Sequence, residues 1–142
     1  MDLNNPVIQL CQAGIRAEFA GKRADAYALY AQAWDAAQSD YEACVAAHYV
    51  ARGQTDPQAI FWWNQEALRR AQLIQAHPEH QPTGQPNSAQ PDTEHVPAIE
   101  TFLPSLYLNM GRSYELVDDP AQAQHYYALA AQLGTIHQPD TR

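Results

Sequence analysis

The sequence predicts an all-helical protein built from three antiparallel helical hairpins. Ala and Gln dominate the composition while Val, Ile and Thr are sparse, which favours helix over strand. Small and aromatic residues recur at matching offsets in three stretches of the chain. At 142 residues, the chain is long enough to bury one core, and we expect a single domain over 1-142.

The internal repeat consists of a small residue, a second small residue about twelve positions later and an aromatic residue about sixteen positions later. A small residue on each of two antiparallel helices lets their backbones approach, and the ring fills the wedge that opens. Each copy therefore predicts one hairpin. The three copies are Gly14, Ala26 and Tyr30; Ala47, Ala59 and Trp63; and Gly111, Ala123 and Tyr127.

Helix start signals agree with this partition. Asn5-Pro6, Asp56-Pro57 and Asp119-Pro120 each offer an N-cap oxygen followed by Pro at the first helical position. Ser39 with Glu42 adds a capping box. The predicted helices lie near 6–20, 23–38, 40–52, 57–76, 104–117 and 120–133, with Gly21, Gly53 and Gly134 marking ends.

The second and third copies are separated by roughly 30 residues more than one repeat requires. The surplus coincides with a Pro- and Gln-rich stretch at about 77–98. Such a composition can neither bury a core nor sustain a helix. We expect a flexible inserted loop there.

The third copy resembles the tetratricopeptide repeat, whose consensus places a large residue, Leu-Gly, Tyr, Ala, an aromatic residue and Ala in that order. The first and second copies depart from it, with Ala at several of the larger-residue positions. The resemblance implies a right-handed α-α superhelix of three repeats, at about 7-39, 40-73 and 104-137. The matching residues are Tyr107, Met110, Gly111, Tyr114, Ala123, Tyr127 and Ala130.

The resemblance also implies that the first helix of each repeat lines a concave groove that binds a peptide or helix of a partner protein. Apolar groups there would receive a side chain, while Arg and His would orient a carboxylate or backbone carbonyl. The Lys and Asn set with which some relatives clamp chaperone tails is missing. The expected groove residues are Ile15, Glu18, Tyr41, Cys44, His48, Arg52, Leu108, Arg112 and Glu115.

Composition and the motifs that are present argue against a nucleic-acid partner, a membrane span and a cofactor. The formal net charge of −8 disfavours a nucleic-acid partner, because phosphate binding needs clustered positive charge. Neither a basic leader nor a long apolar run is present, so we expect a cytoplasmic protein without a membrane span. No phosphate loop or cofactor motif occurs, and no cofactor is expected.

An enzyme is a weaker hypothesis. Cys44 and His48 lie one helical turn apart and, with Glu18, would provide a nucleophile and a base. Such pairs arise by chance in helical proteins, so the sequence predicts no enzyme. A metal site is disfavoured as well, because ordering a Pro-rich loop around the ligands would cost entropy. The residues considered for it are His77, His80, His95, Glu79, Asp92 and Glu94.

Self-assembly is the second hypothesis for function. Repeat arrays usually end in a helix with a polar outer face, but the last predicted hairpin carries Tyr126, Tyr127, Leu129 and Leu133. We expect this end to be covered by the inserted loop, by a partner or by a second copy, which would make a homo-oligomer.

Overall fold

The computed structural model describes residues 4–77 and 99–133, and within these ranges it contains six α-helices and no strand. The all-helical prediction is confirmed. The first four helices and the last agree with the predicted bounds to within two residues. The helices are α1 Pro6–Phe19, α2 Arg23–Ala36, α3 Asp40–Arg52, α4 Pro57–Ala76, α5 Ile99–Leu116 and α6 Pro120–Gln132.

The predicted start of the fifth helix is wrong. Helix α5 begins at Ile99, and Pro104 lies inside it rather than at its first turn. An internal Pro costs about 3 kcal/mol, whereas burying one large aliphatic side chain contributes about 1.5–3 kcal/mol. Ile99 and Leu103 are both buried, so the core favours continuing the helix through Pro104. The predicted loop at 77–98 falls almost wholly outside the described residues.

The helix caps follow the sequence signals. Asn5 Oδ1 accepts hydrogen bonds from the backbone N–H groups of Val7 at 2.8 Å and Ile8 at 3.1 Å, and Asp56 and Asp119 cap α4 and α6 in the same way. The predicted capping box is only half present. Its Ser39 hydroxyl accepts from the N–H of Glu42.

The carboxylate of Glu42 has a different role from the one that a capping box requires. It accepts from the Gln38 N–H and from Asn5 Nδ2, both at 2.8 Å. The second bond joins the cap of α1 to the first turn of α3. The same Asn5 amide therefore starts one helix and holds it against another.

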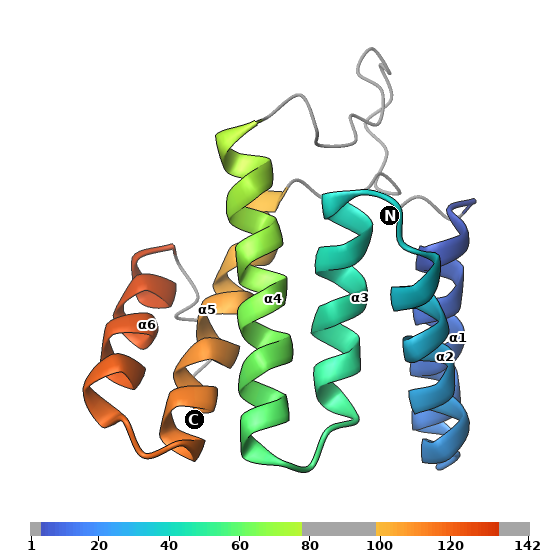
Figure 1. Cartoon of the computed structure of the whole chain (residues 1–142), viewed down its shortest axis with the longest axis horizontal. Coiled ribbons are helices and arrows are strands. Elements are labelled where there is room, and N and C mark those ends of the chain that lie inside the picture. The colour runs from blue at the N-terminus through green and yellow to red at the C-terminus, as the bar shows by residue number, and fades with distance from the viewer. Residues whose placement is uncertain (1–3, 78–98, 134–142) are drawn as a thin grey trace.

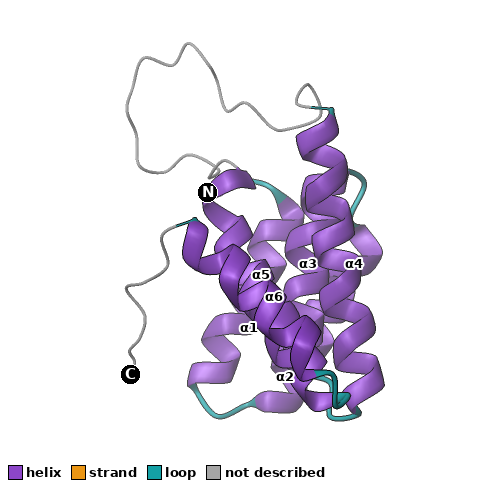
Figure 2. Ribbon diagram, turned by 90° about the vertical axis from the view of Figure 1, so that its left-hand side faces the viewer, coloured by secondary structure: helices purple, strands orange, loops and turns teal. Residues whose placement is uncertain are grey.

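Consecutive helices pack as three hairpins, α1 with α2, α3 with α4 and α5 with α6. Successive hairpins meet through α2 and α3 and through α4 and α5, and α1 also contacts α3 (Figure 1). Figure 2 gives the same arrangement from the side, with every described segment either a helix or a connecting turn. None of the helices in 4–77 and 99–133 is long and apolar enough to cross a membrane.

The first and third hairpins close on the same contact. A Cβ added to Gly14 would overlap the ring of Tyr30, lying 2.7 Å from its Cδ1. A Cβ added to Gly111 would meet Tyr127 at 2.6 Å from the same ring atom. Distances this short do not occur between real atoms, so the two glycines are required by the close approach of the helices.

Two further features repeat with this contact. The Tyr30 hydroxyl donates to Glu18 at 2.7 Å and that of Tyr127 donates to Glu115 at 2.9 Å, each pair twelve residues apart. The turn that joins the two helices contains a residue with left-handed backbone conformation in both hairpins. These residues are Gly21, with φ 82°, and Asp118, with φ 69°. The same set of contacts therefore recurs in these two hairpins. The middle one has the larger Ala47 and Trp63 instead.

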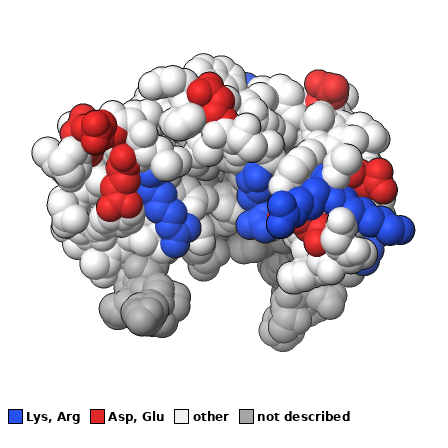
Figure 3. Space-filling model, turned by 90° about the horizontal axis from the view of Figure 1, so that it is seen from below, with Lys and Arg blue, Asp and Glu red and all other residues white. Residues whose placement is uncertain are grey.

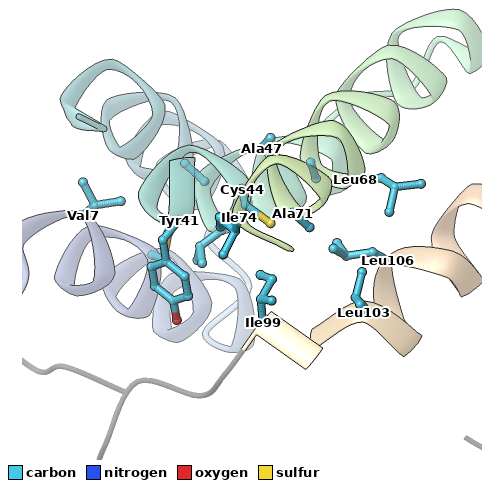
Figure 4. Close-up of a cluster of buried hydrophobic side chains, with 14 of the residues drawn as sticks. Val7, Tyr41, Cys44, Ala47, Leu68, Ala71, Ile74, Ile99, Leu103 and Leu106 are labelled. Atoms are coloured by element: carbon cyan, nitrogen blue, oxygen red, sulfur yellow. The ribbon is translucent and has the colours of Figure 1, made fainter. Parts of the chain in front are cut away.

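A large cluster of buried side chains joins the three hairpins. Figure 4 shows Tyr41 and Cys44 of α3 close to Ile74 of α4 and Ile99 of α5. Helix α3 contributes most to the core because it lies between its neighbours, with eight of its residues buried. The last helix is the least embedded, since only Ala123 and Ala130 are buried in it.

We predict that Gly14→Ala and Gly111→Ala each lower the free energy of unfolding by about 1–3 kcal/mol, because the added methyl overpacks a tyrosine ring. Alanine is otherwise the better helix former by about 1 kcal/mol. Urea unfolding followed by circular dichroism measures the change. A gain in stability for either variant would show that the rings do not fill the space beside the glycines.

Candidate functional site

A groove of about 590 Å³ opens between the ends of α1 and α3, the first half of α4 and the part of α5 from Ser105 to Leu116. Figure 3 views the molecule from this end and shows a hollow with basic side chains on both sides of it. The groove is lined by Glu18, His48, Ala51, Arg52, Ile60, Asn64, Ser105, Leu108, Asn109, Arg112, Ser113 and Leu116.

Five of the nine groove residues expected from the sequence line this groove. A sixth, Ile15, lies in an adjoining hollow of about 260 Å³ that shares Glu18 and Arg52 with it and also includes Phe19 and Tyr49. The structure thus brings together residues from three helices that are far apart in the sequence. The five lining residues are Glu18, His48, Arg52, Leu108 and Arg112.

The remaining three expected residues lie elsewhere. Tyr41 is 4% exposed and Cys44 is fully buried in the core. They do not reach the groove because they belong to the buried cluster in the first half of α3, whereas the groove is lined by residues of its second half. Glu115 is exposed on α5, where it accepts the hydrogen bond of Tyr127, and it does not line the groove.

The environments of Cys44 and His48 oppose nucleophilic chemistry. Burial raises the pKa of the Cys44 thiol to about 12, whereas an activated cysteine needs a lowered pKa. Burial and the nearby Arg52 charge lower the pKa of His48 to about 4. A neutral thiol beside a neutral imidazole is not an activated pair.

Glu18 and Arg52 form one wall of the groove. The Arg52 Nε donates to Glu18 Oε1 at 3.0 Å and its NH2 donates to Oε2 at 2.7 Å. This forked pairing is the main reason that the pKa of Glu18 is lowered, and the hydrogen bond from Tyr30 acts in the same direction. Two of the Arg52 nitrogens are therefore already bound, and the two charges compensate each other.

A chain of polar contacts crosses the groove from α5 to α3. Arg112 NH1 donates to Asn109 Oδ1 at 3.3 Å, and Asn109 Nδ2 lies 3.3 Å from His48 Nδ1. Because the Asn109 oxygen is engaged by Arg112, its amide nitrogen is the group that faces the imidazole. His48 Nδ1 then acts as the acceptor, and in the neutral ring the proton is on Nε2.

A second polar chain lies beneath the first. Asn64 Nδ2 donates to Ser113 Oγ at 2.9 Å, and Ser113 donates to the backbone oxygen of Asn109 at 2.8 Å. Ser113 is fully buried and Asn64 is 6% exposed. A buried polar side chain without its hydrogen bonds costs about 1–3 kcal/mol, so this chain holds α4 and α5 in a fixed register beside the groove.

Sequence reasoning missed Ile60, Asn64, Asn109 and Ser113. A signal for Asn64 was present, since it stands at helical spacing in line with Ala67, Leu68 and Ala71, all of which are buried. A polar residue within such an apolar stripe indicates a buried hydrogen bond. The partner on a different hairpin had no comparable signal.

A larger hollow of about 730 Å³ lies at the turn between α2 and α3. Two of the three charged side chains that line it, Asp40 and Arg70, form an ion pair. Arg70 contacts Asp40 at 3.0 Å and Glu66 at 2.8 Å and lies 5.7 Å from the centre of the Trp34 ring. The groove with His48 and Arg112 is the better candidate for a binding site. Arg112 forms no ion pair among the described residues, whereas Arg70 is paired with two carboxylates.

Most of the histidine and carboxylate set considered for a metal lies outside the described residues. Only His77 is described, at the end of α4. Over 4–77 and 99–133, no three His, Cys, Asp or Glu side chains gather where they could hold a metal ion.

Comparison with known proteins leaves the family open. No model of a known family matches this chain, and neither does a curated protein or a solved structure. The tetratricopeptide assignment therefore stays a prediction from the sequence.

The pKa of His48 predicts how stability depends on pH. Its folded pKa of about 4 lies below the ordinary 6.5, so the unfolded chain takes up the proton first as the pH falls. The contribution of neutral His48 to the free energy of unfolding is fully present above pH 6.5, and it declines as the pH falls toward 4. We predict a loss of about 2 kcal/mol between pH 7 and pH 5.

Urea unfolding of the wild type and His48→Gln at both pH values measures this loss. Glu18 and Glu66, whose pKa values are lowered by their arginine partners, lose their stabilising effect mainly at lower pH. The His48→Gln curve should therefore be flatter over this interval. An unchanged pH dependence in that variant would show that His48 is not held neutral by burial.

Proposed function

We propose that this protein is an interaction module that holds a segment of a partner protein in the groove between α1, α3, α4 and α5. The module would be a right-handed superhelix of three tetratricopeptide-like hairpins. Support comes from the Gly–Tyr packing, the Tyr–Glu hydrogen bond and the left-handed turn residue, all of which recur in the first and third hairpins.

The observation that carries the proposal is the mixed chemistry of the groove. Apolar Ile60, Leu108 and Leu116 lie in the same hollow as His48 and Arg112. A peptide side chain would bury its apolar surface against the first group, while its polar atoms would bond to the second. A volume of about 590 Å³ suits a short segment rather than a whole domain.

The charges favour an acidic or carbonyl group at Arg112. Of the three charged residues that line the groove, Glu18 and Arg52 neutralise each other. Arg112 forms no ion pair among the described residues and is exposed. The groove thus has a local positive charge, although the whole chain carries −8. Such a site would orient a carboxylate and repel a basic group.

A reducing compartment such as the cytoplasm fits the proposal. Cys11 and Cys44 are both free and buried, and burial raises the pKa of each thiol to about 12. They act as small apolar core residues, which is common for cysteines of intracellular proteins.

Self-assembly is a second candidate because large apolar side chains are exposed. Phe19, the last residue of α1, is 88% exposed, and Leu116, the last residue of α5, is 51% exposed. Leu133 beyond α6 is 48% exposed. Exposed apolar groups of this size often belong to contact surfaces, and a second copy would cover them as well as a different partner.

We predict that Arg112→Ala weakens capture of the natural partner by about 10- to 100-fold, the loss expected for one charge-assisted hydrogen bond. Quantitative mass spectrometry of pull-downs from the native cell lysate measures this. Arg69→Ala is the matched control, because Arg69 is an exposed arginine on α4 outside the groove. Partners that are retained equally by both variants would contradict binding in the groove.

We predict that the protein keeps the monomer mass of 15.9 kDa in sedimentation over a wide concentration range. An interaction module with a groove needs no second copy. A mass that rises with concentration, and that falls again in Phe19→Ser and Leu133→Ser, would favour the assembly hypothesis instead. Arg112→Ala should leave the mass unchanged in either case.

A further inference from the structure

Asn64 presents an unused hydrogen-bond acceptor beside the groove. Its neighbour Ser113 donates its hydroxyl proton to the backbone oxygen of Asn109, so Ser113 Oγ can only accept from Asn64. This fixes the orientation of the Asn64 amide, with Nδ2 on Ser113. Within the described residues, the Asn64 Oδ1 then has no hydrogen-bond partner.

This acceptor is unusual for its position. Asn64 is 6% exposed and lines the groove, and buried polar groups in proteins are nearly always hydrogen-bonded. The bond to Ser113 accounts for the Asn64 Nδ2 but not for its oxygen, and an unpaired buried oxygen costs about 1–3 kcal/mol. The Asn64 Oδ1 therefore points to a donor that reaches it from the groove.

His48 supplies the opposite group in the same groove. Its Nδ1 accepts from Asn109, so its proton is on Nε2. No hydrogen-bond partner of Nε2 occurs among residues 4–77 and 99–133. The groove therefore combines one unused acceptor, on α4, with one unused donor, on α3.

We propose that the segment bound in the groove is an extended peptide, whose backbone N–H donates to Asn64 Oδ1 and whose backbone C=O accepts from His48 Nε2. This inference rests on the proposed function and specifies the form of the partner. An extended chain leaves its backbone N–H and C=O groups free for such bonds, whereas the interior of a helix has already paired them.

The size of the groove supports the same choice. A helix with its side chains is about 10–12 Å across, so a groove of about 590 Å³ would hold little more than one turn. An extended segment places more of its length in that volume. Backbone recognition at Asn64 and His48 would tolerate many sequences there, and selectivity would come from the side chains received by Ile60 and Leu108.

The test uses linear 12-residue peptides selected from a random library against the wild-type protein. Selected peptides that lose binding to Leu108→Arg are taken as groove binders. Each is resynthesised with one backbone N–H at a time replaced by N–CH₃, which removes a single donor. Fluorescence anisotropy of labelled peptides gives Kd for the wild type, for Asn64→Leu and for the control Gln65→Leu, an exposed neighbour outside the groove.

One N-methyl position is expected to weaken binding to the wild type and to Gln65→Leu by about tenfold or more, the value of one hydrogen bond to a buried acceptor. The same methylation should have little effect on Asn64→Leu, because that variant lacks the acceptor. Should Asn64→Leu fail to fold, Asn64→Ala takes its place. NMR then also follows the Asn64 amide in the wild type, whose signals should shift with the parent peptide and not with the methylated one.

Two results would overturn the inference. Groove peptides that tolerate N-methylation at every position, or that bind as helices, would leave the proposed function standing and remove the backbone contact with Asn64. A library that yields no peptide sensitive to Leu108→Arg would overturn both proposals. The two failures are distinguishable because only the second lacks a groove binder.

Discussion

The fold depends on how closely the two helices of a hairpin approach. Tyr30 and Tyr127 lie where a side chain at Gly14 or Gly111 would begin, so the first and third hairpins close only because glycine has no Cβ. The tyrosine hydroxyls then bond to Glu18 and Glu115 on the facing helices. One tyrosine thus has two effects in each of these hairpins. Its ring sets the distance between the two helices, and its hydroxyl fixes how one helix is aligned along the other. The glycine required by packing costs helix propensity, which the burial of Tyr30 offsets.

This spacing also positions the groove. Glu18 receives Tyr30 from its own hairpin and Arg52 from the next, so the contact that closes the first hairpin also orients the wall of the groove. On the other side, Ser113 joins Asn64 of the middle hairpin to the third one. The groove is therefore built from contacts between hairpins. Glu18 is held by the buried Tyr30 and by Arg52, and Asn64 is held by the buried Ser113, which is the preorganisation that binding sites need.

The sequence predicted what is local and repeated. The N-caps at Asn5, Asp56 and Asp119 and the Gly14–Tyr30 spacing depend on neighbours along the chain or on a pattern that recurs. It did not predict what depends on tertiary burial. Pro104 looked like a helix start, but the burial of Ile99 extends the helix past it. A repeat consensus assigns groove positions in the same way to every hairpin, whether or not neighbouring helices bury them. For this reason the expected groove included Tyr41 and Cys44, which are buried in the core. The hydrogen bond of Asn64 joins residues 49 apart in sequence, a separation at which neither periodicity nor capping carries information.

The close contact between glycine and tyrosine is open to one direct measurement. In the NMR spectrum, Hα protons of Gly14 and Gly111 packed against aromatic rings should be shifted upfield, with strong nuclear Overhauser effects to the Tyr30 and Tyr127 ring protons respectively. Those signals would establish that both hairpins close as described, and with them the walls of the groove. Glycine Hα protons at ordinary shifts, without Overhauser contacts to either ring, would contradict the account.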